Sequence, residues 1–426
     1  MRIFAFLIYL TLFAGLGQLR AQNPENLSRS FSENIRTPRL YPVFNDQPNP
    51  MAPPVIRLGG QETLRLDFDD LGDEEYVDYR VKITHCDAIW KKSDLFPRNY
   101  LRDYNDFMVE EYEFSANTET EYTRYTFDLP PVTRSGNYLV TVFDEDNKAV
   151  LQERFMVYEP MVNVQTDFMD ANMVSNRRKR HRLVTQISHQ ALEIRDPNNN
   201  IFVVLRQNRS WATAKYGLTP TRVNESARTV LYDPFNESNE FGAGSEYRFV
   251  DLRAVTFLGQ NVLSMEKRTT GYHAVVAFDK PRGHESYSQI DDLNGLFAIG
   301  SNDTKQGLVD PDYITATFSL ITPKLAKGKK IYLAGMFSDN APDSRFLMKY
   351  DTGLGGYTAS AKLKQGFYNY RYLVVDAQGK INNSVEGDHF EAENEYETFV
   401  YLRDVQQRAD RLIGYKRTNF SRIPSR

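Results

Sequence analysis

A cysteine and a histidine stand side by side at Cys86 and His85, and Cys86 is the only cysteine of the chain. Such a pair could supply a nucleophile and its base, or two ligands of a metal ion. Apolar residues alternate through Tyr79, Val81 and Ile83, which predicts a strand with His85 on its apolar face. Cys86 should then point to the opposite face. We expect a buried histidine and a small apolar thiol at a strand end, with no catalytic pair between them.

The other histidines show no spacing typical of metal ligands. They are His181, His189, His273, His284 and His389, and a second cysteine is missing. The sequence also lacks a phosphate-binding glycine loop, a Gly-x-Ser-x-Gly elbow and a His-Glu-x-x-His motif. Paired carboxylates such as Asp69-Asp70 lie in turn-like stretches, where acidic residues are common for backbone reasons. We therefore expect no catalytic residue, no metal site and no cofactor, and predict that the protein is not an enzyme.

The amino terminus has the pattern of a secretory signal. Arg2 is followed by an apolar run over residues 3–16, and Leu19-Arg20-Ala21 ends in a small residue before a polar segment. This predicts a signal peptide over residues 1–21 and export of the remaining chain. The run is too short to span a membrane, so we expect no membrane insertion of the protein itself.

Composition narrows the class of protein further. The chain carries 56 acidic and 52 basic residues, which argues against nucleic acid as a main partner. A single cysteine cannot form an internal disulfide, so stability has to come from burial. The 26 tyrosines and 27 phenylalanines suit the half-buried faces of strands.

Short alternating segments separated by turn residues recur along the chain. Residues 64–68, 79–83, 138–143 and 150–158 read as strands. Strands of this length with turns every eight to twelve residues or so are typical of β-sandwiches. The predicted fold is all-β, with tandem immunoglobulin-like β-sandwich domains, and the first domain is expected over residues 22–160.

Two further domains are expected after residue 160. The middle one, over residues 161–311, is strand-rich and ends in a long loop near residues 281–310, where Gly, Asp, Asn and Ser dominate. The last, over residues 312–426, resembles the early-set immunoglobulin-like sandwich and ends in a basic tail from Arg403. Sandwiches of that type occur beside glycan-active enzymes, so carbohydrate binding is an alternative function. The absence of tryptophan after Trp211 weakens this alternative, because such sites stack sugar rings on exposed aromatic side chains.

The densest charge run of the chain covers residues 177–182, with the sequence Arg-Arg-Lys-Arg-His-Arg. The simpler interpretation is a solvated loop between strands. The other is a basic rim that contacts an acidic partner surface or lipid headgroups.

Several strings together resemble one family. They are His85-Cys86-Asp87-Ala88-x-Trp90, the stretch that ends at Asn117-Thr118, Gln207-Asn208, the Gly-Ser-Glu-Tyr-Arg stretch that ends at Arg248, and Glu386-Gly387-Asp388-His389-Phe390. The chain resembles the plug protein family of the type IX secretion system over essentially all of its length after the signal peptide. The family commonly has Gly-Asn-Glu-Phe-Arg where this chain has Gly-Ser-Glu-Tyr-Arg, which is a mild difference.

This resemblance implies a periplasmic protein that docks on the periplasmic mouth of a very large outer-membrane translocon barrel and blocks the pore when no cargo passes. The barrel would be its partner and would hold it at the outer membrane, and no small-molecule substrate is implied. The signature residues His85, Cys86, Asp87, Trp90, Asn117, Gln207, Asn208 and Arg248 are expected to serve in packing. The surface that meets the translocon stays unassigned at this stage.

Overall fold

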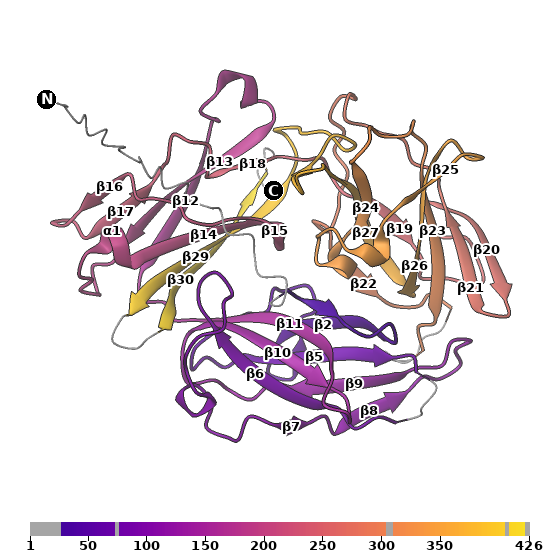
Figure 1. The fold of residues 1–426 in the computed structure, drawn as a ribbon, viewed down its shortest axis with the longest axis horizontal. Coiled ribbons are helices and arrows are strands. Elements are labelled where there is room, and N and C mark those ends of the chain that lie inside the picture. Colours follow the sequence, from indigo (N-terminus) through magenta and orange to yellow (C-terminus); the bar gives the residue numbers. More distant parts are fainter. Residues whose placement is uncertain (1–26, 73–75, 304–309, 405–408, 422–426) are drawn as a thin grey trace, which may run out of the picture.

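The molecule consists of three β-rich units that surround a common junction (Figure 1). The computed structural model describes residues 27–72, 76–303, 310–404 and 409–421. The predicted signal peptide, residues 1–21, lies outside the described residues. Each unit is built from two sheets around its own hydrophobic core. This arrangement confirms the predicted all-β fold of tandem β-sandwiches.

The first unit is formed by the amino-terminal third of the chain. One sheet has the order β1 (Arg29–Ser30), β11 (Ala149–Tyr158), β10 (Gly136–Phe143), β6 (Arg80–Cys86) and β7 (Phe107–Met108), with β4 (Val55–Arg57) parallel to β11. The other has the order β3 (Gln47–Pro48), β2 (Ile35–Phe44), β5 (Thr63–Asp70), β9 (Thr123–Asp128) and β8 (Glu111–Phe114). Alternation decides which side chains enter the core between the sheets: Phe68 stacks on Tyr125 at 5.2 Å between ring centroids, and Tyr138 stacks on Phe155 at 5.0 Å.

The middle unit combines strands from two distant parts of the chain. Its first sheet contains β12 (Asn163–Met169), β13 (Arg180–Ser188), β17 (Thr229–Tyr232) and β16 (Arg222–Asn224), with β18 (Glu240–Gly242) paired to β13. Its second sheet has the order β15 (Ser210–Lys215), β14 (Ile201–Gln207), β29 (Asn394–Asp404) and β30 (Ala409–Phe420). Figure 1 shows the yellow carboxy-terminal strands beside β14.

The sequence alone places β29 and β30 in a separate domain over residues 312–426 with a basic tail. In the structure these two strands share a sheet with β14 and β15 of the middle unit. Strand β29 pairs with β14 along its length, from Ile201 opposite Leu402 to Gln207 opposite Tyr396. Half of the expected tail is strand β30, which pairs with β29, while residues 405–408 and 422–426 lie outside the described part of the chain. Alternation reveals a strand but carries no information about its partner, because pairing is decided by burial of apolar faces from distant segments.

The third unit begins well before the predicted boundary at residue 311. One sheet has the order β20 (Val262–Arg268), β21 (Gly271–Val276), β23 (Tyr313–Leu320), β26 (Gly356–Lys364) and β25 (Lys349–Asp351). The other contains β19 (Arg248–Asp251), β27 (Gly366–Val375), β22 (Phe297–Ile299), β24 (Lys330–Ala334) and β28 (Ile381–Asn382). The loop expected near residues 281–310 holds β22 in its described part, and β22 pairs with β27.

Helices are short throughout the described ranges. They are α1 (Pro197–Asn200) and the 3₁₀ turns η2 (Pro97–Asn99), η3 (Val174–Asn176), η4 (Met336–Ser338) and η5 (Ser344–Phe346). Within those ranges, no helix has the length and apolar character needed to cross a membrane.

The basic run over residues 177–182 is only partly the solvated loop that the sequence favours. Arg177, Arg178 and Lys179 are exposed, but strand β13 begins at Arg180. His181 is buried, and its Nδ1 lies 2.7 Å from the hydroxyl of Tyr396.

Removal of strand β30 tests the division of the sheets. Leu412 and Ile413 of this strand are buried, and loss of a buried aliphatic side chain costs about 2–5 kcal/mol. A chain that ends after Asp404 should therefore fail to give soluble protein with a cooperative thermal transition. A chain that ends after Ser421 serves as the control and should unfold at the wild-type temperature. Wild-type Tm for the shorter chain would contradict the assignment of β30 to the middle unit.

Candidate functional site

The cysteine motif lies at the seam between the first and middle units. Strand β6 ends at Cys86, and the carboxylate of Asp87 then accepts hydrogen bonds from the backbone N–H groups of Ile89 and Lys91, at 3.0 and 2.8 Å. This tight turn places Trp90 at φ +66° and buries its ring. Cys86 and Trp90 belong to one apolar cluster with Trp211 of the middle unit. The motif thus packs two sandwiches together.

His85 points to the other face of β6, into the core of the first unit. Its Nδ1 lies 2.9 Å from Ser93 Oγ, and its ring meets Tyr138 edge to face at 5.0 Å. Burial lowers the pKa of His85 to about 4 and raises the pKa of the Cys86 thiol to about 12. Both groups are therefore uncharged at neutral pH and lie on opposite faces of the strand, as the alternation predicts.

Two arginines and two tryptophans form a layered contact across the same seam. Trp90 and Trp211 meet edge to face at 5.0 Å between ring centroids. The guanidinium of Arg154 lies 4.4 Å from the centroid of Trp90, and that of Arg206 lies 4.3 Å from Trp211. Arg206 also forms a buried bidentate ion pair with Glu397, at 2.7 and 2.8 Å. Cation–π contacts of desolvated groups contribute about 2 kcal/mol, so this layer fixes the two units firmly.

Gln207 and Asn208 connect the middle unit to its own carboxy-terminal strand and to the third unit. The side-chain amides of both residues donate to Asn394 Oδ1, at 3.1 and 2.7 Å. Asn208 adopts φ +45°, and its backbone carbonyl accepts a hydrogen bond from Asn340 of the third unit at 3.1 Å. An asparagine tolerates this left-handed conformation better than most residues. The pair therefore marks a second seam.

The remaining signature residues lie elsewhere. Arg248 forms ion pairs with Asp279 at 2.7 Å and with Glu386 at 3.2 Å, all half-buried or buried. These contacts join the start of β19 to the connection after β28. Asn117 is exposed, with φ +59°, on the loop between β8 and β9. The structure thus brings His85, Cys86, Asp87 and Trp90 to one seam and Gln207 and Asn208 to another, while Asn117 and Arg248 are distant from both.

The third seam, between the first and third units, depends on a buried charge pair that the sequence does not reveal. Asp69 lies inside β5, not in a turn, and its carboxylate is 2.7 Å from Lys364 Nζ of β26. The hydroxyl of Tyr313 donates to the same carboxylate at 2.5 Å and lies 2.7 Å from Thr37 Oγ1. Asp69 and Lys364 are almost 300 positions apart in the sequence (364 − 69 = 295). The sequence around Asp69 therefore gives no sign that its carboxylate is paired and buried.

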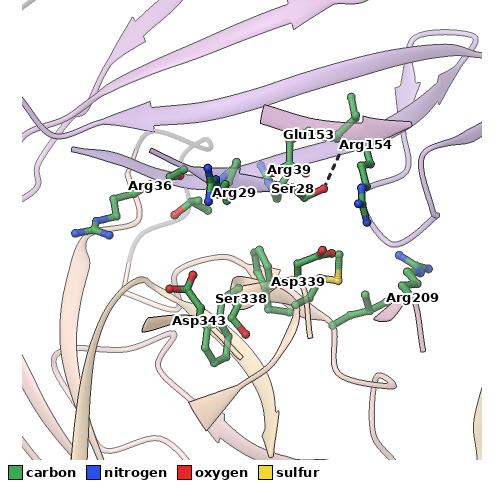
Figure 2. Close-up of a pocket in the computed structure, with 18 of the residues that line it drawn as sticks. Ser28, Arg29, Arg36, Arg39, Glu153, Arg154, Arg209, Ser338, Asp339 and Asp343 are labelled. Carbon is green, nitrogen blue, oxygen red and sulfur yellow. Dashed lines mark hydrogen bonds between the residues drawn. The ribbon is translucent and has the colours of Figure 1, made fainter. Parts of the chain in front are cut away.

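A cavity of about 140 Å³ lies where the three units meet (Figure 2). Its basic side chains are Arg29, Arg36, Arg39, Arg154, Arg206, Arg209, Arg345 and Lys362, and its acidic ones are Glu153, Asp339 and Asp343. Burial raises the pKa of Glu153 to about 8 and that of Asp339 to about 6. Glu153 is mostly protonated at pH 7, so the lining itself is basic. Three of its arginines, Arg39, Arg206 and Arg209, form ion pairs with carboxylates outside the lining.

The chemistry of these sites is that of packing and charge. Within the described ranges, no group of three or more His, Cys, Asp and Glu side chains is placed to hold a metal ion. The features together define a class of protein: an all-β assembly of three interlocked sandwiches with a basic cavity at the junction.

Comparison with known proteins shows a similarity to one family over part of the chain. Residues 35–159, which form most of the first unit, match the family model of the Type 9 secretion system plug protein 1st domain. This match confirms, over residues 35–159, the resemblance that the sequence strings indicate. No curated protein matches the chain.

One solved structure is similar to nearly the whole chain. The crystal structure of a hypothetical protein from Parabacteroides merdae has a TM-score of 0.87 at 27% sequence identity, and the match covers 92% of this chain and 99% of that one. Escherichia coli alpha-2-macroglobulin activated by porcine elastase is 11% identical, with a TM-score of 0.14 and coverage of 91% of this chain and 32% of that chain. A TM-score that low supports no argument.

The seam between the first and third units should dominate stability. Replacing Lys364 by Met leaves the carboxylate of Asp69 buried without its cation, which costs about 3–5 kcal/mol. Arg268→Met removes the exposed pair with Glu266 and should cost less than about 0.5 kcal/mol. Equilibrium urea unfolding measures both. Equal stability of the two variants would show that the buried pair does not hold the seam.

The thiol of Cys86 should be unreactive in the folded protein. With a pKa of about 12, only about one thiol in 10⁴ is ionised at pH 8, compared with about a quarter in an unfolded chain. Alkylation by iodoacetamide, followed by mass spectrometry, should be slower by at least about a thousandfold in native buffer than in guanidinium chloride. Labelling of the folded protein at the unfolded rate would contradict the burial of this side chain.

Proposed function

We propose that this protein is a non-enzymatic periplasmic plug of the type IX secretion system. It docks on the periplasmic mouth of the outer-membrane translocon barrel and blocks the pore when no cargo passes. The observation that carries the proposal is the match of residues 35–159 to the plug protein family. Export by the predicted signal peptide would deliver the protein to the periplasm, where the barrel holds it at the outer membrane.

The architecture suits a stopper for a wide pore. A compact chain of about 400 residues has a radius of gyration of roughly 21 Å, which corresponds to a body roughly 55 Å across. Strands about 4.8 Å apart and tilted by about 40° give a barrel of about 36 strands a diameter of roughly 70 Å. Such a barrel would leak solutes unless a body of similar size covered its mouth. Three sandwiches locked by the buried Asp69–Lys364 ion pair and the Trp90–Trp211 contact keep their relative positions when they bear on the pore.

The middle unit carries an apolar tip that could anchor the docking. Met173, Val174 and Phe235 are 55%, 75% and 86% exposed. The two loops that carry them are tied together, because the side-chain amide of Asn172 donates to the carbonyl of Pro234 at 3.2 Å. Exposed apolar side chains gathered in this way mark protein interaction sites. The neighbouring exposed residues 177–179, Arg-Arg-Lys, add positive charge that favours an acidic rim on the partner.

Gating then follows from differential affinity. A plug that binds the empty translocon more tightly than the loaded one is released when cargo enters, and no chemical step is needed. The difference in affinity between the two translocon states sets how completely the pore closes.

Carbohydrate binding by a separate carboxy-terminal sandwich has less support. Tyr368, Tyr370 and Tyr372 of strand β27 are buried and cannot stack on a sugar ring. Residues 312–426 are also divided between two units, so they do not form a binding module of their own.

Affinity capture tests the proposed docking. Tagged wild-type protein should co-purify with a very large barrel from detergent-solubilised outer membranes, and deletion of the gene should increase entry of a normally excluded dye. The variant Met173→Ser, Val174→Ser, Phe235→Ser should retain the fold but capture at least about tenfold less barrel, because it loses the apolar anchors.

The matched control replaces two exposed aromatic residues of the first unit. Phe96 and Tyr104 are 66% and 85% exposed, and Phe96→Ser with Tyr104→Ser should leave capture unchanged. Unchanged dye entry in the deletion strain, with no barrel captured by the wild-type protein, would refute the plug function. Loss of capture only in the control variant would move the docking site to the first unit.

A further inference from the structure

The cavity at the junction has a cluster of like charges at one end. Arg36 comes from β2 of the first unit, whereas Arg345 of η5 and Lys362 of β26 come from the third unit. Burial lowers the pKa of Arg36, and the nearby Arg345 lowers it further. The pKa of Lys362 is likewise lowered by burial and then by Arg36. Three cations from two units are thus held close enough to repel one another.

The acidic groups around this end do not balance the charge. Asp343 lies in the lining and pairs with Arg345, with 2.9 Å between its Oδ2 and the Nε of Arg345. Glu33 is exposed to solvent outside the cavity. The carboxylate of Asp312 already accepts the backbone N–H groups of Glu119, Thr120 and Tyr313. These backbone N–H groups do not cancel the charge of Asp312, whose carboxylate raises the pKa of Lys362. Three cations against the two carboxylates of Asp343 and Asp312 leave this end with one positive charge in excess.

Two guanidinium groups of the lining each have one buried N–H donor without an acceptor among the described residues. Within the described part of the chain, the Nε atoms of Arg36 and Arg39 are buried without a hydrogen-bond partner. A buried donor of this kind costs free energy unless something outside the protein satisfies it. In Figure 2, Arg36 lies at one end of the gap, and Arg154 and Arg209 point into it from the other.

The cavity also has an apolar wall. Leu296, Phe297, Phe337, Phe346 and Tyr368 of the third unit line the cavity. Its volume of about 140 Å³ exceeds that of several water molecules, each of which occupies about 30 Å³ in the liquid. A ligand that fits both walls carries an anionic group toward the arginines and an aromatic or acyl body toward the rings.

We propose that this cavity binds a phosphomonoester, with the phosphate held by Arg36, Arg345 and Lys362 and its organic body against the apolar wall. A phosphate monoester carries a charge of about −1.5 to −2 at neutral pH, so three cations attract it more strongly than they attract a singly charged anion. Guanidinium groups hold phosphate oxygens through paired hydrogen bonds, better than a lone ammonium does. The bound phosphate bridges the first and third units and relieves the repulsion between them. This inference is independent of docking on the translocon.

Binding of phenyl phosphate to the purified mature protein tests the site. Titration calorimetry should show saturable binding, and a saturating concentration should raise Tm by at least about 3 °C. Benzoate, which has a single negative charge on the same ring, should bind at least about tenfold more weakly. Benzoate binding as tight as that of phenyl phosphate would overturn the assignment to phosphate.

Two variants, one on each side of the gap, identify the residues. Arg36→Gln and Lys362→Gln should each weaken phenyl phosphate binding at least about tenfold, whereas Lys349→Gln, on exposed β25 of the third unit, should not change it. Removing one of three like charges should leave both cavity variants at least as stable as the wild type in chloride buffer, which shows that they fold. No binding by the wild type, or binding that both variants retain, would refute the proposal.

A second set of probes distinguishes the sources of a phosphomonoester. Dihexanoyl phosphatidic acid represents a lipid, glucose 6-phosphate a sugar, and inorganic phosphate the group alone. Tighter binding of the lipid or of the sugar than of inorganic phosphate supports the proposal and names the class. If inorganic phosphate binds as tightly as both esters, the apolar wall takes no part and the proposed organic body is wrong.

Discussion

The fold depends on pairing charges that are buried between separate sandwiches. A carboxylate or ammonium that leaves water must find a partner of opposite charge in good geometry, and removing one partner costs several kcal/mol. Asp69 with Lys364 joins the first and third units in this way. Arg206 pairs with Glu397 inside the middle unit and stacks on Trp211, and Trp211 meets Trp90 of the first unit across the seam. Such contacts tolerate little displacement, so they fix how the three units are oriented.

This constraint explains why the family strings are where they are. The His85-Cys86 motif suggests chemistry, yet its side chains are neutral and serve packing on two sides of one strand. Gln207 and Asn208 likewise satisfy buried polar groups next to Asn394. A body proposed to cover a pore needs seams that do not open, and six of the eight signature residues lie at such seams, Asn117 and Arg248 being the other two.

Local pattern predicts local structure well and distant contacts poorly. Alternation predicts strands such as β6 and the opposite faces of His85 and Cys86, because both follow from the two-residue period of a strand. It cannot show that β29 pairs with β14, or that Asp69 meets Lys364, because each contact joins segments about 200 or more positions apart. The cavity is invisible to the sequence for the same reason: its lining is assembled from all three units.

The central claim is that this body closes a pore, and conductance measures that directly. The translocon barrel, purified without the protein and inserted in a planar lipid bilayer, should show large steady currents. Adding the purified protein to the periplasmic side should abolish these currents, and adding it to the other side should not. Currents that persist after the protein has demonstrably bound to the barrel would contradict the account.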